Sequence, residues 1–253
     1  MARTSSPARA LALLAAAAVL VTAGSADARR RKHKKHRGRP NPRVEHPADA
    51  ATTPAVRYGA LGPDACLDEL TRRGVPYVLD TADGVATAVR LTGPLRGVAF
   101  HSGAPADQRD TASFEITDCR LALVLDDFAA LLARHGVVEV VHYSLYRHGA
   151  DGDPRPSKHA GGLAIDAGRF VRADGTALSV LDDFHGRIGA RPTCGPTARP
   201  RRPTDATRAL RAILCEAVDA RLFHIVLTPN YNRPHRNHFH MELNPGARWF
   251  LTH

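Results

Sequence analysis

The stretch SKHAGGLAID, residues 157–166, places His159 and Asp166 seven positions apart around a Gly-Gly pair. A catalytic zinc ion takes three protein ligands at about 2.0–2.2 Å and keeps its fourth position for water. Because glycine adopts tight-turn conformations without strain, Gly161 and Gly162 allow the chain to fold His159 back toward Asp166. This arrangement favours a metal site beside the strand expected from residue 163.

A second stretch, HRNHFH, residues 235–240, contains three histidines in six positions. If residues 237–243 form a strand, alternation puts His238, His240 and Glu242 on one face and the apolar residues between them on the core face. Two histidines on one strand face are about 6.6–7 Å apart at the backbone, so both can reach one site, one of them just outside the ligand set. An H-x-H pair alone is a weak signal. Together with the upstream stretch it indicates a metal site rather than two coincident polar strands.

The rest of the chain predicts an α+β fold. Apolar residues at helical spacing indicate a helix over residues 119–135, with Gly136 as its stop signal. Thr204 is typical of the cap that begins a second long helix, and residues 66–73 are typical of a short one. Strands are expected in pieces over 79–100 and at 137–147, 163–170, 223–228 and 237–243. Helices and strands do not alternate strictly, which favours α+β over α/β.

The N-terminal 57 residues are expected to precede the folded domain. Residues 1–28 have the basic start, the short apolar core and the Ala-Asp-Ala end of a secretory signal peptide, cleaved after Ala28. A buried N-terminal helix is the alternative. Residues 29–57 are expected to form a disordered basic tail and linker, because a run of like charges repels itself and buries nothing. The domain is then residues 58–253.

The net charge of +10 is concentrated at one end of the chain. Residues 1–43 hold 11 of the 35 Lys and Arg and a single acid, whereas residues 44–253 hold 24 bases and 24 acids. A nucleic-acid-binding domain needs its excess charge on the folded surface, so we expect no nucleic acid as a partner. The basic segment Arg29–Arg43 is instead expected to attract anionic polymers of the cell envelope.

The four cysteines are expected to form two disulfides, because an exported protein folds in an oxidising compartment. Four cysteines allow three connectivities. Pairing Cys66 with Cys119 and Cys194 with Cys215 is favoured, since each bridge then joins neighbouring segments. No pair has C-x-x-C spacing, which makes metal binding by cysteine the weaker interpretation.

At these motifs the sequence resembles the bacterial extensin-like C-terminal domain family, related to the lysostaphin, D-Ala-D-Ala metallopeptidase and hedgehog group of zinc domains. The resemblance covers about residues 64–243, including the 157–166 motif, the run 228–240 and the Cys194–Cys215 spacing. It implies a small antiparallel sheet that carries a zinc site and is flanked by helices. It also implies that His159, Asp166 and His240 bind Zn²⁺.

The same resemblance implies three catalytic residues. His238 would lie beside the metal, and His235 matches a histidine that murein endopeptidases of the group place near the attacking water. Other members use a glutamate near that place, and this sequence has none there. Arg147 matches a family arginine that could hold a carboxylate or an oxyanion, although Tyr146 stands where the family usually has cysteine. A surface salt bridge is the alternative for Arg147.

The sequence therefore predicts an exported zinc metallopeptidase, in the periplasm or outside the cell, that hydrolyses peptidoglycan stem peptides or cross-links as a monomer. Two other functions remain open at this point. The domain could be a noncatalytic, zinc-stabilised module that binds the cell envelope. Alternatively, the basic tail could be the functional part of a polyanion-binding protein.

Overall fold

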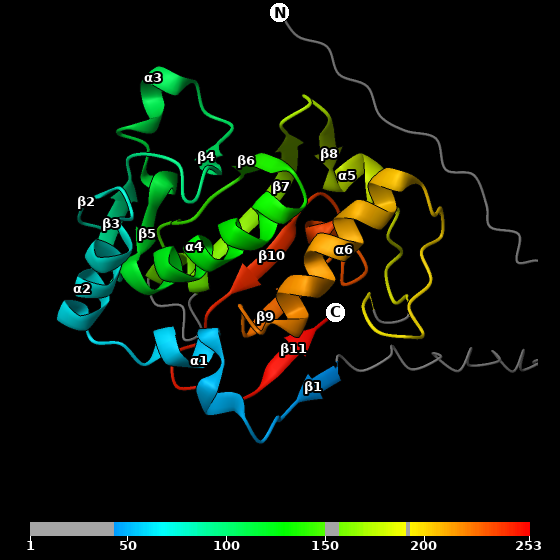
Figure 1. Ribbon diagram of the computed structural model, residues 1–253, viewed down its shortest axis with the longest axis horizontal. Helices are drawn as coiled ribbons and strands as arrows, with labels where there is room; N and C mark the ends of the chain where they lie inside the picture. The colour runs from blue at the N-terminus through cyan, green and yellow to red at the C-terminus, as the bar shows by residue number, and fades with distance from the viewer. Residues whose placement is uncertain (1–42, 150–156, 191–192) are drawn as a thin grey trace, which may run out of the picture. The chain divides into compact units, whose positions relative to one another are not determined.

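The computed structural model describes residues 43–149, 157–190 and 193–253. The predicted signal peptide and the predicted tail up to residue 42 lie outside these ranges. The architecture is α+β, as the sequence predicts, and its strands form two sheets within the described residues. In the helical part, α4 and α6 contact each other and lie over one face of the larger sheet (Figure 1).

The larger sheet has eight strands within the described ranges. In spatial order they are β1 (Arg43–Glu45), β11 (Phe250–Thr252), β9 (Ile225–Leu227), β10 (Phe239–Glu242), β7 (Ala164–Arg172), β6 (Val137–His142) and β4 (Ala99–Ser102), while β8 (Ala177–Ser179) also pairs with β7. A smaller sheet contains β2 (Tyr77–Leu79), β3 (Ala88–Leu91) and β5 (Ile116–Asp118).

The expectation of a small antiparallel sheet holds only around the site, where β9, β10, β7 and β6 pair antiparallel, and the whole sheet is larger and mixed. The β11–β9 and β4–β6 pairs are parallel, and β1 and β11 extend the sheet beyond the site. A parallel pair needs a crossover connection, and α4 lies in the one between β4 and β6. The three-residue strands at the other edge are too short to show an alternating pattern in the sequence.

The helices and short 3-10 turns connect these strands. Their bounds are η1 Ala50–Thr52, α1 Pro54–Gly59, α2 Pro63–Arg73, α3 Ala106–Arg109, η2 Ser113–Glu115, α4 Cys119–Arg134, η3 Lys158–Gly161, α5 Val180–Asp183, α6 Asp205–Asp219 and η4 Arg233–His235. The two long helices are confirmed with their end signals. Gly136 follows α4 with φ +71°, and the Thr204 hydroxyl accepts from the Thr207 N–H at the start of α6.

Residues 43–57, which the sequence assigns to the linker, are folded. β1 pairs with β11, and α1 buries Ala55 completely. The backbone N–H of Ala55 donates to the carbonyl of Arg221, and the Tyr58 hydroxyl donates to Asp127 of α4. The run of Pro, Ala and Thr is typical of a linker because these residues are small. Small residues also let α1 pack closely against the rest of the domain.

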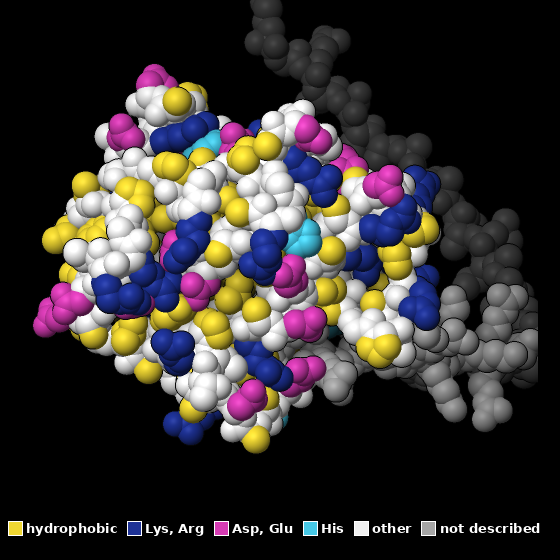
Figure 2. Space-filling model, in the orientation of Figure 1, with side chains coloured by type: hydrophobic (Ala, Val, Ile, Leu, Met, Phe, Trp, Pro, Cys, Tyr) yellow, Lys and Arg dark blue, Asp and Glu magenta, His cyan; other side chains and the backbone are white. Residues whose placement is uncertain are grey.

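Both favoured disulfides are present. Cys66 of α2 bonds to Cys119 at the start of α4, and Cys194 bonds to Cys215 of α6. Disulfides are typical of proteins that fold outside the cytoplasm. No helix in the described ranges is both long and apolar enough to cross a membrane. Basic and acidic side chains are interspersed over the face that carries α4 and α6 (Figure 2), in keeping with the balanced charge of residues 44–253.

Candidate metal centre

Strands β7 and β10 place Asp166 and His240 directly opposite each other. The two strands are antiparallel, and their register pairs these residues. Ile165 and Ala167 of β7, like Phe239 and Met241 of β10, belong to the hydrophobic core. Because successive side chains alternate, Asp166 and His240 point to the other face of the sheet. The alternation expected for residues 237–243 is confirmed.

The η3 turn carries His159 to the same place. The Ser157 hydroxyl accepts from the backbone N–H of His159 at the start of the turn and so helps to orient it. Gly162 ends the turn with φ +63°. A Cβ at this position would lie 2.7 Å from the backbone nitrogen of Asp118, so glycine is required by space as well as by conformation.

Three atoms converge where these elements meet. Asp166 Oδ1 lies 2.8 Å from His240 Nδ1 and 3.1 Å from His159 Nε2. The two imidazole nitrogens are 3.3 Å apart. All three residues are buried. The structure therefore brings together the three residues that the sequence assigns to the metal.

The outer nitrogen of each imidazole is already engaged. His159 Nδ1 lies 3.0 Å from the carbonyl oxygen of Leu145 and donates to it. His240 Nε2 lies 2.8 Å from Glu242 Oε2 and donates a hydrogen bond to it. In its neutral form, each ring can therefore turn an unprotonated nitrogen toward Asp166. Metal-binding histidines are held in this way, by a hydrogen bond from the nitrogen that does not bind the metal.

The donor set fits a metal ion. Two imidazole lone pairs and a carboxylate oxygen within hydrogen-bond distance repel one another unless a cation lies among them. Two nitrogens and one oxygen are ligands that zinc accepts. In the protein without metal a proton takes this place. Burial lowers the pKa of His240, but its hydrogen bonds with Asp166 and Glu242 outweigh burial and raise the pKa to about 9.

Asp166 is held as an anion by its neighbours. Burial raises the pKa of its carboxyl, but hydrogen bonds with three histidines lower it far below the usual range. Arg147 adds an ion pair, with its guanidinium nitrogen 3.2 Å from Asp166 Oδ2. Arg147 therefore forms a salt bridge from the surface to a buried candidate ligand, since its own side chain is about half exposed.

His238 and His235 lie beside the three convergent residues. His238 Nε2 is 3.3 Å from Asp166 Oδ1. His235, in η4, has its ring 5.2 Å from that of His238 and 5.6 Å from that of His240. The structure thus gathers all six residues that the sequence singles out for the site.

A family comparison agrees with this geometry. The model of the family described as "Extensin-like protein C-terminus" matches residues 64–251. The chain belongs to the extensin-like family. Comparisons with curated proteins and with solved structures found no match. The family match covers η3, β7 and β10, so the candidate centre lies inside the extensin-like domain.

Two groups with no role in the sequence analysis, the Glu242 carboxylate and the Leu145 carbonyl, contribute to the centre of the extensin-like domain. Strand alternation placed Glu242 on the histidine face, which was the available signal. Nothing in the sequence indicated Leu145. The strand expected over 137–147 ends at His142, with a register shift between Val141 and His142, and the chain beyond it passes the centre.

A separate buried pair lies between β6 and η2 of the extensin-like domain. His142 Nε2 is 3.2 Å from Glu115 Oε2, and Glu115 Oε1 accepts from the Ser102 N–H. Burial lowers the pKa of His142. Burial raises the pKa of Glu115, but these contacts outweigh it and lower the pKa to about 2.

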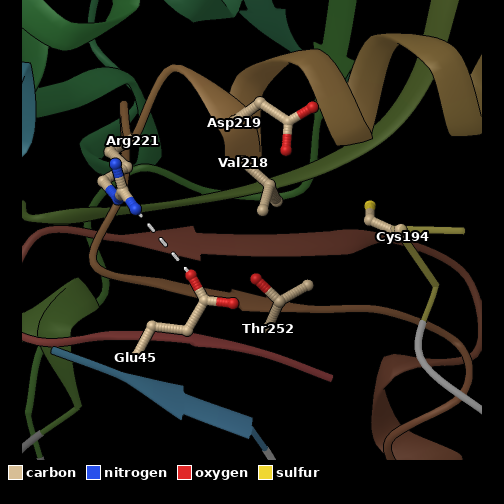
Figure 3. Close-up of a pocket in the computed structure, with 7 residues that line it drawn as sticks. Glu45, Cys194, Val218, Asp219, Arg221 and Thr252 are labelled. Carbon is tan, nitrogen blue, oxygen red and sulfur yellow. Dashed lines mark ion pairs between the residues drawn. The ribbon is translucent and has the colours of Figure 1, made fainter. Parts of the chain in front are cut away.

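A cavity of about 200 Å³ lies away from the centre, between β1, β11 and the end of α6. Arg221 faces Glu45 across it at 4.0 Å (Figure 3). None of the six site residues lines this cavity. The ion pair instead joins β1 to the loop after α6, which explains part of the folding of residues 43–57.

Proposed function

We propose that this extensin-like chain is an exported, zinc-dependent peptide hydrolase that acts on peptidoglycan peptides, as a D-Ala-type carboxypeptidase or endopeptidase. The observation that supports it is the convergence of His159 Nε2, Asp166 Oδ1 and His240 Nδ1, with His235, His238 and Arg147 around them. The same donor set supports a relationship to the lysostaphin, D-Ala-D-Ala metallopeptidase and hedgehog group.

His159, Asp166 and His240 would hold the zinc ion. When bound, such an ion supplies an acidified water and polarises the carbonyl to be attacked. The protein contributes rigid positions: the ligands come from two paired strands and one capped turn. The Arg147 side chain is about half exposed while one of its nitrogens pairs with Asp166. Its remaining N–H groups can therefore donate to a substrate carboxylate or to a developing oxyanion.

His235 is the residue best placed to accept a proton. Its Nδ1 lies 2.6 Å from the side-chain oxygen of Asn232 and donates to it, which leaves Nε2 as an acceptor. Burial, followed by repulsion from His238 and His240, lowers the pKa of His235 to about 4. The ring is therefore neutral near pH 7 and can act as a general base. Asn232 holds its orientation.

One observation favours the noncatalytic alternative, a zinc-stabilised module that binds the envelope. The carboxylate of Glu242, which lies beside the centre, is engaged by His240. A general base with a pKa near 4 is weak. The two functions share the metal and differ only in turnover.

Location and partners follow from the same proposal. Two disulfides support a compartment outside the cytoplasm, either the periplasm or the extracellular space. The basic segment Arg29–Arg43 would hold the domain near anionic envelope polymers, within a Debye length of about 8 Å at physiological salt. Stem peptides or their cross-links would then reach the centre.

Digestion of purified peptidoglycan, with products read by mass spectrometry, tests the proposal. We expect cleaved peptides that disappear on chelation, return with Zn²⁺ and are absent with His240→Ala. The matched control is His135→Ala, which should leave cleavage unchanged. His135 lies at the end of α4 and pairs with Glu216 of α6. If the protein binds one zinc ion and the peptides stay intact, hydrolysis is rejected. The noncatalytic, zinc-stabilised binding module is then the better interpretation.

A further inference from the structure

An exposed aromatic ring stands beside the candidate centre. Tyr143 directly follows β6, and its backbone N–H donates to the carbonyl of Asp166 at 2.9 Å. The ring meets that of His238 edge-on, with centroids 5.8 Å apart. Tyr143 is 53% exposed, although its position is fixed on both sides. Exposed aromatic rings with fixed positions are typical contact residues, because little side-chain entropy is lost when a ligand packs on them.

The ring of Tyr143 packs against the backbone of Gly168. A Cβ at Gly168 would lie 2.9 Å from Tyr143 Cε2 and 3.3 Å from Cζ, closer than side chains pack. The φ of Gly168 is not positive, so its backbone conformation suits any residue. Glycine inside a strand weakens that strand. The absence of a side chain at this position of β7 is therefore explained by the space that the ring of Tyr143 occupies.

A second tyrosine stands at the other end of the histidine cluster. The ring of Tyr231 meets that of His235 edge-on at 5.3 Å, and Tyr231 is partly exposed. His235 and His238 lie between the two tyrosines. Among the residues that the structure describes, none hydrogen-bonds the Tyr143 hydroxyl. At this end of the histidine cluster, the ring and hydroxyl of Tyr143 lie next to His238.

Building on the proposed function, we infer that Tyr143 is a substrate-contacting residue, against which the peptide packs beside the bond to be cut. An apolar ring that carries one hydroxyl suits a segment with small uncharged side chains and backbone amides. A methyl group packs on the ring, and an amide hydrogen-bonds the hydroxyl. Gly168 is the positioning residue that keeps the ring in this place.

Steady-state hydrolysis of a stem peptide by the full chain loaded with zinc tests the contact. Tyr143→Ala should raise KM about tenfold and leave kcat within about twofold, since binding is lost in ground state and transition state alike. Tyr143→Phe should give a smaller rise from the lost hydroxyl. Leu79→Ala, which removes an exposed apolar side chain from the smaller sheet, is the matched control. An unchanged KM in Tyr143→Ala, or a loss of bound zinc, would overturn the inference.

A double-mutant cycle tests whether Gly168 positions the ring of Tyr143. Gly168→Ala should displace the ring and raise KM about as much as Tyr143→Ala does. Adding Gly168→Ala to Tyr143→Ala should have no further effect, because the displaced ring is already gone. If the two increases in KM are additive, Gly168→Ala disturbs strand β7 rather than the ring of Tyr143. The positioning role of Gly168 would then be wrong.

Binding separates this inference from the proposed function. Fluorotyrosine incorporated into the full chain, assigned with Tyr143→Phe, reports a bound stem peptide by ¹⁹F NMR. A peptide that shifts the Tyr143 resonance without being cleaved would reject hydrolysis and support the contact. A peptide that is cleaved without shifting it would reject the contact and leave hydrolysis intact.

Discussion

Glu242 Oε2 lies 2.8 Å from His240 Nε2. The two residues are two positions apart on the same face of β10. This contact decides which nitrogen His240 offers to the centre, because the proton on Nε2 leaves the lone pair on Nδ1. Glu242→Ala should therefore lower the affinity for zinc by about 10–100-fold, the usual effect of removing such a partner. Glu242→Gln, which still accepts a hydrogen bond without the charge, should lower it less. Competition with a chromogenic chelator measures both.

Glu139→Gln provides the control for Glu242. Its carboxylate, on β6, is 3.6 Å from His101 and 4.0 Å from Arg169. Zinc affinity should stay unchanged in this variant. If Glu242→Ala binds zinc as tightly as the unaltered protein, His240 does not depend on Glu242 for its orientation.

Zinc removal should lower the thermal stability of the extensin-like domain. An ion present at 100 times its Kd stabilises the folded state by about 2.7 kcal/mol. For a domain of about 200 residues this corresponds to roughly 5–10 °C in Tm. Calorimetry with and without chelator measures the shift. His159→Ala should show no response to zinc, and a response of full size would exclude His159 from the ligand set.

Local rules predicted part of the candidate centre, whereas the set of three ligands was implied by the resemblance to the family. Alternation along β10 places His240 on one face, and a capped turn with Gly162 returns His159 to its strand. The hydrophobic pattern of α4 and the Thr204 cap gave the long helices. Each of these signals lies within a few residues of the structure it predicts.

The rest depends on contacts between residues far apart in the chain. β1 forms only because residues 250–252 pair with it, and the parallel β4–β6 pair depends on the crossover through α4. Tyr143 looked like the interior of a strand, and its exposure follows from the end of the ladder at His142. A single sequence carries no direct signal for such pairings, so the sheet was expected to be too small.

Acidification should destabilise the fold through Glu115 and His142. In the unfolded chain the carboxyl of Glu115 titrates near 4.5, whereas in the folded protein its pKa is about 2. Between these values the unfolded chain binds a proton that the folded protein does not, so stability present above pH 4.5 is lost as the pH falls. The difference corresponds to about 3 kcal/mol. Burial also lowers the pKa of His142, and this shift acts in the same direction as the pH falls.

Urea denaturation of Glu115→Gln between pH 7 and pH 3 checks this. The variant should be less stable at pH 7, and its deficit relative to the unaltered protein should shrink as the pH approaches 3. A deficit that stays constant would show that Glu115 has no depressed pKa in the folded protein.

The two disulfides should contribute unequally because they close loops of different length. Cys66 and Cys119 are 53 residues apart, and Cys194 and Cys215 are 21 apart. The chain-entropy relation gives about 4 kcal/mol for the longer loop and about 3 kcal/mol for the shorter one. Replacing each pair by alanine and measuring unfolding in urea compares them at equal pH. Cys66 and Cys119 are also almost completely buried, so their removal leaves a space in the core that adds to the loss. A larger loss from the Cys194–Cys215 pair would show that loop entropy does not govern their contributions.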